Sequence, residues 1–448
     1  MQTPVYDFVK TYAKSKAIRL HMPGHKGKGK LGVEPFDVTE ITGADSLYEA
    51  KSIIFQSEKN ASELFGANTF YSTEGSSQCI RAMLFLASRF AKTENKKLKI
   101  LAARNVHKTF LSGVALLGLE VEWLYGKKEN GYLRCEITAE QLENALAKGG
   151  KDGFCAVYLT SPDYLGNRQD IQKMSAVCRK FGVLLLVDNA HGAYLKFLSK
   201  SEHPIDLGAD ICCDSAHKTL GVLTGGAYLH LNKNLPKSLC QQAKSGLSLF
   251  GSTSPSYLIL TSLDLANREL ANAYPKRLKR VLEQMEKSQK NLRDSGYEFV
   301  GNEPLKWTLD CKKYGYLGTE IAEKLQKKGV FCEFADRDYL VLMFSANNKK
   351  TEIKRVENLL ESIERRRAIK QDPPAVFEAE RGMEIRESVF SESEEIAVKN
   401  AVGRILATPS VSCPPAVPIL ACGETIDERA IETFSYYGVE RVRVVKEK

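Results

Sequence analysis

The sequence lacks a long apolar run and lacks the cysteine patterns of secreted or zinc-binding proteins. No apolar stretch approaches the roughly 18 residues of a membrane-spanning helix. The opening residues, MQTPVYDFVKTYAKS, contain no apolar segment of the signal-peptide kind. None of the 11 cysteines forms a CxxC pair, and a chain of 448 residues has little need of a disulfide framework. We therefore expect a cytoplasmic protein with reduced thiols, no membrane partner and no metal site.

The sequence also lacks a concentrated block of charge. Its 64 basic and 55 acidic residues leave a net charge of +9, spread through stretches such as YPKRLKRVLEQMEKSQK. This spacing is typical of solvated helix faces, and no aromatic residues alternate with the basic ones as they do on nucleic-acid surfaces. We expect no nucleic-acid partner, although a basic binding protein stays open as the non-enzymatic alternative.

Nucleotide-binding motifs are missing as well. The stretch GKGKLG, residues 27–32, fits GxGxxG by its letters. A dinucleotide fingerprint needs a strand before it and a helix after it, whereas HMPGH precedes this stretch and VEPFD follows it. There is no Walker A pattern, so neither a nicotinamide nor a nucleotide triphosphate site is expected.

Seven apolar runs predict strands of an α/β domain. Several are apolar throughout and helix-like segments separate them, which is typical of a largely parallel sheet covered on both faces. The seven runs are NTFYST, LKILAA, VEWLY, FCAVYLT, GVLLLVD, ADICCD and GAYLHL.

The rest of the chain predicts smaller parts. Residues 256–297 are mainly helical. Four short strand candidates (YEFVG, KWTLD, GVFCEFAD, YLVLMFS) and a helical GTEIAEKLQKKG then indicate an α+β unit. An amphipathic helix and a linker, AIKQDPP, precede a last segment with one helix, the turn-rich PSVSCPPAVPILACGE and a final strand. We predict an N-terminal arm at 1–55, a large cofactor-binding domain at 56–270, a small α+β domain at 271–366 and a C-terminal domain at 367–448.

Polar residues gather where the predicted strands end. In STEGSSQCIRAML, Gly75, Ser76 and Ser77 lie between a strand and a helix, where a helix N-terminus attracts phosphate. An ordinary serine N-cap is the alternative. In LLLVDNAHG, Asp188 ends the most apolar strand, and a buried carboxylate there needs a partner such as a protonated ring nitrogen. A turn-capping aspartate is the alternative.

A lysine follows another predicted buried strand in DSAHKTLGVLTGG. A phosphate site, a buried carboxylate and an oriented Lys218 together match pyridoxal phosphate, which carries a phosphate, a ring nitrogen and an aldehyde that condenses with lysine. His107, in RNVHKT, also follows a strand. Its imidazole has the shape to stack on the cofactor ring, although a lone histidine in such a place is more often structural.

These motifs together resemble the Orn/Lys/Arg decarboxylase family, in its short form. The family belongs to the fold-type-I pyridoxal-phosphate enzymes, which are related in fold to aspartate aminotransferase. The matching stretches occur in the family's order between residues 21 and 424. They are HMPGHKG, DVTEITGADSL, EGSSQCIRAM, RNVHKT, DNAHGAY, DSAHKTLGVLTGGAYLHL, GSTSPSY and PPAVPILACGE.

The resemblance implies a role for each motif. Lys218 is expected to bind the cofactor aldehyde, Asp188 to pair with the ring nitrogen, His107 to stack on the ring and His191 to lie near its substituents. The phosphate is expected near Gly75, Ser76, Ser77, Ser215 and His217, with Thr253 and Ser254 reaching it from a neighbouring subunit. The smallest active form implied is thus a homodimer. Lys218 or His217 is the candidate proton donor.

The implied reaction is decarboxylation of arginine, lysine or ornithine to the amine, as in polyamine metabolism. Three positions depart from the family pattern: Asn189 replaces the glutamate of DEAH, Tyr194 replaces its second histidine, and Cys422 replaces a proline before the final GE. These departures leave an aminotransferase or another lyase on the same fold as the alternative.

Overall fold

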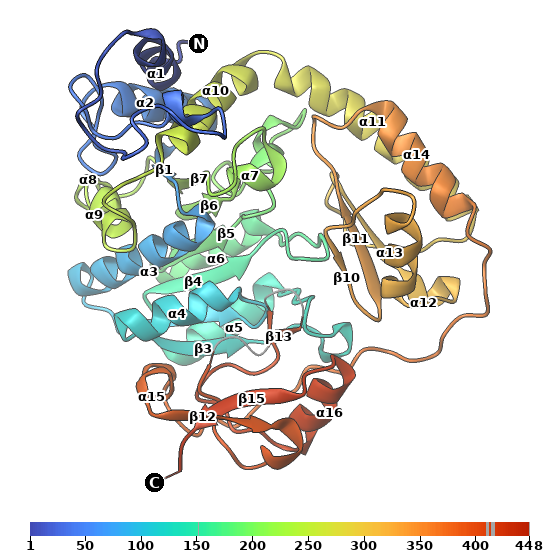
Figure 1. The fold of residues 1–448 in the computed structure, drawn as a ribbon. Helices are drawn as coiled ribbons and strands as arrows, with labels where there is room; N and C mark the ends of the chain where they lie inside the picture. The colour runs from blue at the N-terminus through green and yellow to red at the C-terminus, as the bar shows by residue number, and fades with distance from the viewer. Residues whose placement is uncertain (151, 409–411, 414–416, 448) are drawn as a thin grey trace. The chain divides into compact units, whose positions relative to one another are not determined.

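The computed structural model describes residues 1–150, 152–408, 412–413 and 417–447 (Figure 1). The chain forms two compact units. The first contains residues 1–94, 171–179 and 184–279, and the second contains residues 95–170, 180–183 and 280–448. The four-domain division stays a prediction. Of the turn-rich stretch at 409–424, residues 409–411 and 414–416 lie outside the described residues.

All seven predicted apolar runs are strands of one sheet, with the order β1-β7-β6-β5-β4-β2-β3. In the first unit β5 and β6 are parallel, and β7 runs antiparallel to both β6 and β1. In the second unit β2 is parallel to β3 and to β4. The predicted α/β class with a mostly parallel sheet is confirmed. The strands are β1 (Asn68–Ser72), β2 (Lys99–Ala103), β3 (Glu120–Leu124), β4 (Ala156–Thr160), β5 (Leu184–Asp188), β6 (Ile211–Asp214) and β7 (Ala227–Leu231).

The central strands are buried along their length, which explains why their sequences are apolar without alternation. Every residue of β5, β6 and β7 is buried. Helix α3 (Gly75–Thr93) packs on β1, β5, β6 and β7. It presents Cys79, Met83 and Leu86 at the i, i+4, i+7 spacing of one buried helix face. This packing places the N-terminus of α3 beside the strand ends that carry the candidate site.

The first unit also contains an N-terminal helical layer. Helix α1 (Pro4–Lys14) contacts α2 (Ile53–Phe65) and α10 (Tyr257–Ala271). Asp264 of α10 accepts hydrogen bonds of 3.0 Å from the backbone N–H groups of Val5 and Tyr6, which have no partner within α1. Shorter elements complete the unit: η1 (Glu34–Phe36), η3 (Ala193–Phe197), α7 (Ala216–Thr219), α8 (Lys237–Cys240) and α9 (Ala243–Ser248). Helices α6 (Ile171–Phe181) and α11 (Tyr274–Asp294) contain residues of both units.

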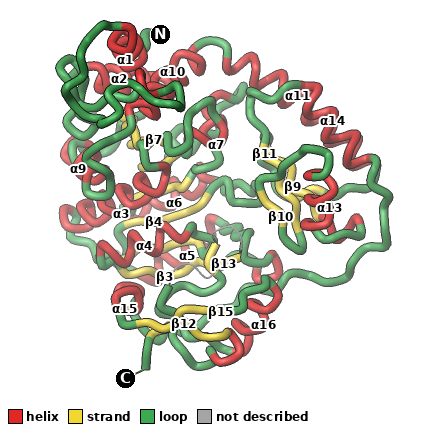
Figure 2. The backbone as a smooth tube through the Cα atoms, viewed as in Figure 1, coloured by secondary structure: helices red, strands yellow, loops and turns green. Residues whose placement is uncertain are grey.

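The second unit contains a small antiparallel sheet with the order β10-β11-β9-β8. Figure 2 labels its strands β9, β10 and β11. Each of the four short strand candidates contains one of its strands: β8 (Phe299–Val300), β9 (Lys306–Asp310), β10 (Phe334–Ala335) and β11 (Tyr339–Met343). Helices and turns around these strands and around β2–β4 are α4 (Lys108–Leu117), η2 (Lys128–Asn130), α5 (Ala139–Gly149), α12 (Cys311–Tyr314), α13 (Gly318–Gln326) and α14 (Lys350–Glu361).

The C-terminal segment of the second unit is richer in structure than the sequence predicted. Two helices form where one was expected, and the final strand, β15, pairs with β12, which was not predicted. The elements are α15 (Ile385–Phe390), β12 (Ser393–Ala397), η4 (Val398–Asn400), β13 (Ser412–Cys413), β14 (Val417–Pro418), α16 (Glu428–Tyr436) and β15 (Arg441–Val445). Leu406, Ile419, Phe434 and Val444 belong to the hydrophobic core of this unit. Among the described residues, no helix combines the length and apolarity needed to cross a bilayer.

Candidate active site

Lys218 lies in a sharp turn after β6, where the sequence predicted an oriented lysine. Strand β6 ends at Asp214, Ser215 occupies the N-cap position of α7, and Lys218 is the third residue of that one-turn helix. The Lys218 Nζ atom lies 3.0 Å from Nε2 of His191, in the loop after β5. This hydrogen bond joins two predicted site residues. Because neutral imidazole accepts a proton near neutral pH, His191 is placed to exchange one with the lysine.

The turn after Lys218 requires a glycine at position 225 for a steric reason. Gly225 has a φ of 97°, and a Cβ atom there would lie 2.8 Å from the backbone oxygen of Thr73. The carbonyl of Gly226 accepts the His217 backbone N–H at 3.1 Å and faces His217 Nδ1 at 3.0 Å. A carbonyl only accepts, so Nδ1 carries a proton. Burial lowers the pKa of His217, which favours a neutral ring whose Nε2 is an acceptor.

Asp188 is the last residue of β5, as predicted, and is 3% exposed. Its Oδ1 accepts the backbone N–H of Ala190 at 3.2 Å and lies 3.7 Å from the Sγ of Cys213. Cys213 is the residue opposite Asp188 in the β5–β6 pairing. The carboxylate is thus fixed at the strand end by its own loop and by the neighbouring strand.

The N-terminus of α3 and the Lys218 turn meet at the predicted phosphate cradle. The hydroxyls of Ser76 and Ser215 lie 2.7 Å apart. Gly75 has a φ of 72°, and a Cβ atom there would meet only the His217 ring, at 3.9 Å, so the space beside it is open. The Gly75 backbone N–H donates to the Gly225 carbonyl at 2.7 Å. Gly75 therefore contributes room rather than a donor, and Ser77 lies in the first turn with Ser76.

His107 lies in the second unit, in the loop after β2, where it caps α4. Its Nδ1 accepts the backbone N–H of Thr109 at 3.2 Å, and it lies 2.9 Å from the Thr109 hydroxyl. Because Nδ1 is an acceptor, the ring proton of a neutral His107 is on Nε2. The ring is thereby held in one tautomer and orientation at the strand end, and its stacking role stays a prediction.

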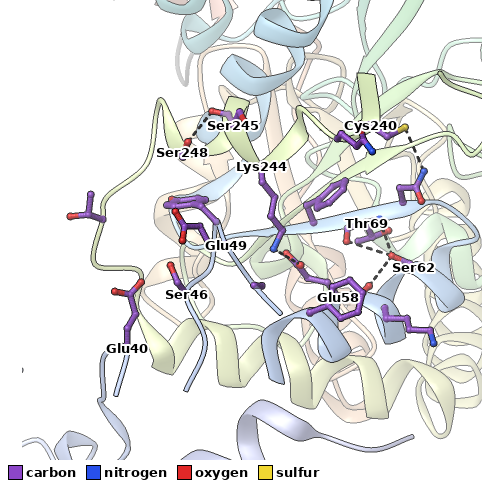
Figure 3. Close-up of a pocket in the computed structure, with 18 residues that line it drawn as sticks. Glu40, Ser46, Glu49, Glu58, Ser62, Thr69, Cys240, Lys244, Ser245 and Ser248 are labelled. Carbon is purple, nitrogen blue, oxygen red and sulfur yellow. Dashed lines mark hydrogen bonds and ion pairs between the residues drawn. The ribbon is translucent and has the colours of Figure 1, made fainter. Parts of the chain in front are cut away.

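Thr253 and Ser254 are exposed on the loop before α10. This loop is held by the neighbouring Ser252, whose backbone N–H donates to the carboxylate of Glu74. Thr253 lines a pocket of about 1170 Å³ in the first unit (Figure 3). Inside this pocket Lys244 points toward Glu58, and the ion pair measures 2.7 Å. Burial raises the pKa of Glu58 to about 6.

A cluster beneath the Lys218 turn was not predicted. Asp214, the first residue of the DSAHK stretch, is fully buried and lies within hydrogen-bonding distance of His203 and His230. The three groups converge closely enough to suggest a metal site. However, Nδ1 of His203 accepts the Ile205 backbone N–H at 3.4 Å, so its proton is on Nε2, facing the carboxylate. A metal bound at Nε2 would require the opposite tautomer.

The C-terminal motif ends in a buried ion pair of the second unit. Glu424 Oε2 lies 3.1 Å from the guanidinium of Arg104 and accepts the Ala421 backbone N–H at 2.7 Å. Arg104 also donates to the carbonyls of Pro418 and Ile419. Arg104 begins the loop that carries His107, so the C-terminal segment supports that loop. The departing residue Cys422 is buried, which raises the pKa of its thiol to about 12 and makes it unreactive.

The residues of the first unit fit pyridoxal phosphate. A lysine paired with an imidazole, a buried carboxylate at the next strand end and an open space beside Gly75, next to two hydroxyls, are the groups its aldehyde, ring nitrogen and phosphate require. Together with the mostly parallel sheet, they define an enzyme of the fold-type-I pyridoxal-phosphate class.

Comparison with known proteins gives the family. The Orn/Lys/Arg decarboxylase major domain matches residues 3–306, and the C-terminal domain of the same family matches residues 364–442. The chain belongs to the Orn/Lys/Arg decarboxylase family and is a pyridoxal-phosphate-dependent decarboxylase. This outcome removes the binding-protein alternative and favours decarboxylation over the other reactions left open by the three departures.

Two relatives and two solved structures extend this assignment. The arginine decarboxylase of Bacillus subtilis is 28% identical over 96% of this chain and 92% of its own, and that of Bacillus anthracis is 26% identical over 96% and 92%. The lysine decarboxylase of Francisella novicida superposes with a TM-score of 0.78 at 14% identity, over 99% of this chain and 81% of that chain. The constitutive lysine decarboxylase of E. coli gives 0.76 at 20% identity, over 99% and 82%.

Proposed function

We propose that this enzyme removes the α-carboxylate of a basic amino acid, with arginine as the favoured substrate, and releases the amine. The observation that carries the proposal is the hydrogen bond of 3.0 Å between Lys218 and His191, at the strand end next to buried Asp188. The arginine decarboxylases among the relatives support the choice of arginine. The lysine decarboxylases among the solved structures make lysine the second candidate.

Bound pyridoxal phosphate supplies an acceptor for the electron pair that remains when carbon dioxide leaves. Lys218 binds the cofactor through its side-chain nitrogen, which must be uncharged to act as a nucleophile. His191 is the group that accepts the ammonium proton, because its Nε2 is the hydrogen-bond partner of Nζ. The proton held on His191 would return to Nζ when the lysine is not bound to the cofactor.

Asp188 would stabilise a positive charge on the ring nitrogen of the bound cofactor. A nearby buried carboxylate favours the charged form of a titrating base, and burial strengthens this interaction by excluding water. The backbone N–H of Ala190 fixes the carboxylate, so little reorganisation is needed during the reaction. Ser76, Ser77, Ser215 and the N-terminus of α3 would bind the phosphate, and Gly75 would leave room for it.

Proton delivery after loss of carbon dioxide falls to Lys218 or His217. Lys218 regains a proton through His191, so it can donate one to the α-carbon. The Nδ1 proton of His217 is held by the Gly226 carbonyl, so His217 has only an accepting Nε2 when neutral. This geometry favours Lys218 as the donor and assigns His217 to orienting the cradle.

A second copy of the chain completes the enzyme in this proposal. Thr253 and Ser254 are exposed, as required of residues that serve a neighbouring site. The first unit also exposes large apolar side chains on its N-terminal arm: Ile18 is 86%, Leu20 90% and Leu31 83% exposed. Large apolar side chains that are this exposed on one arm are candidates for a contact surface. A homodimer that covers this arm accounts for both observations.

The deciding experiment measures carbon dioxide and amine release from arginine, lysine and ornithine separately. The proposal expects release with arginine at the highest kcat/KM and no net transfer of the amino group to a keto acid. Amino-group transfer without carbon dioxide would contradict it. An amine product would be consistent with a role in polyamine metabolism. The free cysteines are consistent with a reducing compartment such as the cytoplasm.

A further inference from the structure

Asp214 is a buried carboxylate with three side-chain donors. Its Oδ2 lies 3.0 Å from His203 Nε2 and 3.1 Å from His230 Nε2, and its Oδ1 accepts the Asn189 amide at 2.7 Å. All four side chains are 0% exposed. Burial alone would raise the pKa of Asp214, but the two histidines hold it well below its usual range. Asp214 is therefore an anion at neutral pH.

The two histidines act as donors to this anion. The Ile205 backbone N–H occupies Nδ1 of His203, and the Thr69 hydroxyl lies 2.9 Å from Nδ1 of His230. Burial lowers the pKa of His230, which favours its neutral form. Through Nε2, both imidazoles face the Asp214 carboxylate, which is the central acceptor of the cluster.

The cluster joins the two strand ends that carry the proposed site. Asn189 directly follows Asp188 of β5, and Asp214 ends β6, four residues before Lys218. The hydrogen bond between Asn189 and Asp214 therefore ties one strand exit to the other, in addition to the backbone bond from Asn189 N–H to the Cys213 carbonyl at 3.0 Å. Asn189 Oδ1 has no partner in the described structure, so the amide is oriented by Asp214.

The contact also explains a departure from the family pattern. A carboxylate at position 189, as in DEAH, would place two anions at the 2.7 Å separation that Asn189 and Asp214 now occupy. Two carboxylates that close cannot both ionise. In this chain the negative charge is carried instead by Asp214, the residue that accepts the hydrogen bond from Asn189.

We propose that Asp214 is a positioning residue. A single negative charge on the hydrogen-bonded pair of positions 189 and 214 fixes the strand ends that carry Asp188 and Lys218. The inference rests on the proposed function of the Lys218 site. Its charge also favours the protonated form of a cofactor bound there, since a nearby anion stabilises a cation.

Isosteric substitutions test this charge in four combinations. The variant N189D has two carboxylates, D214N has none, and N189D/D214N returns one charge on the opposite side. In the double variant the new amide at 214 donates to the new carboxylate while its oxygen still accepts from both histidines. Asp264→Asn is the matched control. Asp264 is also a buried aspartate of this unit that accepts from three donors, but it lies in α10 and binds the start of α1.

Two measurements separate positioning from general stability. The thermal unfolding midpoint of the apoprotein is measured for each variant, and the visible absorbance of the cofactor-loaded protein is titrated with pH. We expect D214N to lower the pH midpoint of the absorbance change on the order of half a unit. N189D/D214N should return it toward the wild type, and D264N should leave it unchanged. N189D should bind cofactor at least about tenfold more weakly than the double variant.

The outcomes are distinguishable. A wild-type protein that takes up no cofactor at all would overturn the proposed function itself. If the wild type binds cofactor normally but N189D/D214N binds it no better than N189D, the inference of a single shared charge is wrong. An insoluble N189D/D214N variant counts as the same result. A D214N midpoint equal to that of D264N and the wild type would also overturn it.

Discussion

Asp214 and Asp264 are buried aspartates of the same unit, each accepting three hydrogen bonds, yet their pKa values move in opposite directions. Asp214 is held by two imidazoles and an amide, and its pKa lies below the usual range. Asp264 is held by two backbone N–H groups and the Ser57 hydroxyl, and burial raises its pKa to about 6. The difference shows that the kind of donor, more than the number of donors, decides whether a buried carboxylate stays charged.

The locations of the two residues give this difference a function. Asp264 joins α1 to α10, where burial favours the neutral acid over the anion. Asp214 lies at the β6 exit beside the Lys218 turn, where a lasting negative charge acts on the chemistry. Substitutions around Lys218 should therefore affect the chemistry, whereas substitutions around Asp264 should affect only stability.

The largest effect is expected from Lys218→Ala, which should abolish decarboxylation. No other described group replaces a nitrogen paired with His191, and the half-buried side chain adds little to the core. Carbon dioxide release and the visible absorbance of the loaded protein measure the loss. The apoprotein should unfold at nearly the wild-type temperature. Retained turnover would place the chemistry elsewhere.

The Asp188→Asn variant should lose turnover by roughly 10²-fold, or about 3 kcal/mol of barrier, with a much smaller loss of cofactor affinity. The ring nitrogen loses its anion, while the lysine and the cradle still hold the cofactor. Steady-state kinetics and an apoprotein titration with cofactor measure the two quantities. A proportionate loss of both would show that Asp188 serves binding rather than the reaction.

The unfolding free energy should depend on pH through Asp264, in the direction opposite to that of a carboxylate with a lowered pKa such as Asp214. Its folded pKa of about 6 exceeds the ordinary value of roughly 3.9, so its stabilising contribution is present below the ordinary value and is lost as pH rises through about 6. Between these limits wild type should lose about 3 kcal/mol of unfolding free energy relative to Asp264→Asn. Denaturant unfolding of the apoprotein across this range measures the difference. Equal pH slopes would contradict the raised pKa.

The smallest effect is expected from Lys196→Ala. Lys196 pairs with Asp206 at 2.7 Å near the surface of the same unit, and such pairs contribute about 0–1 kcal/mol. The variant should keep its cofactor, its turnover and nearly all of its stability. Loss of the lysine-bound cofactor here would mean that the wrong lysine has been assigned.

The sequence predicted the strands of the large sheet because their residues are buried on both faces and their runs are apolar throughout. Strand β12, SEEIA, escaped prediction because it is only partly buried and rich in acidic side chains. Helix α16 was obscured by the turn-rich residues before it. Local patterns reveal full burial far better than partial burial.

The strand-end residues Asp188 and Lys218 were predictable because each directly follows an apolar run. The Asp214 cluster was not, since His203 and His230 reach Asp214 from 11 and 16 residues away. His203 lies outside the matching motifs, and His230 had no expected role within DSAHKTLGVLTGGAYLHL. The one available signal was the departure at Asn189, whose cause became visible only through its contact with Asp214.

The most direct test of the Lys218 assignment is borohydride reduction of the cofactor-loaded enzyme followed by peptide mapping. Reduction fixes the cofactor to the lysine that binds it. Cofactor attached to Lys218 alone, in the peptide that contains DSAHKTLGVLTGG, is the predicted result. Attachment to Lys108, Lys196 or any other lysine would contradict the active site described above.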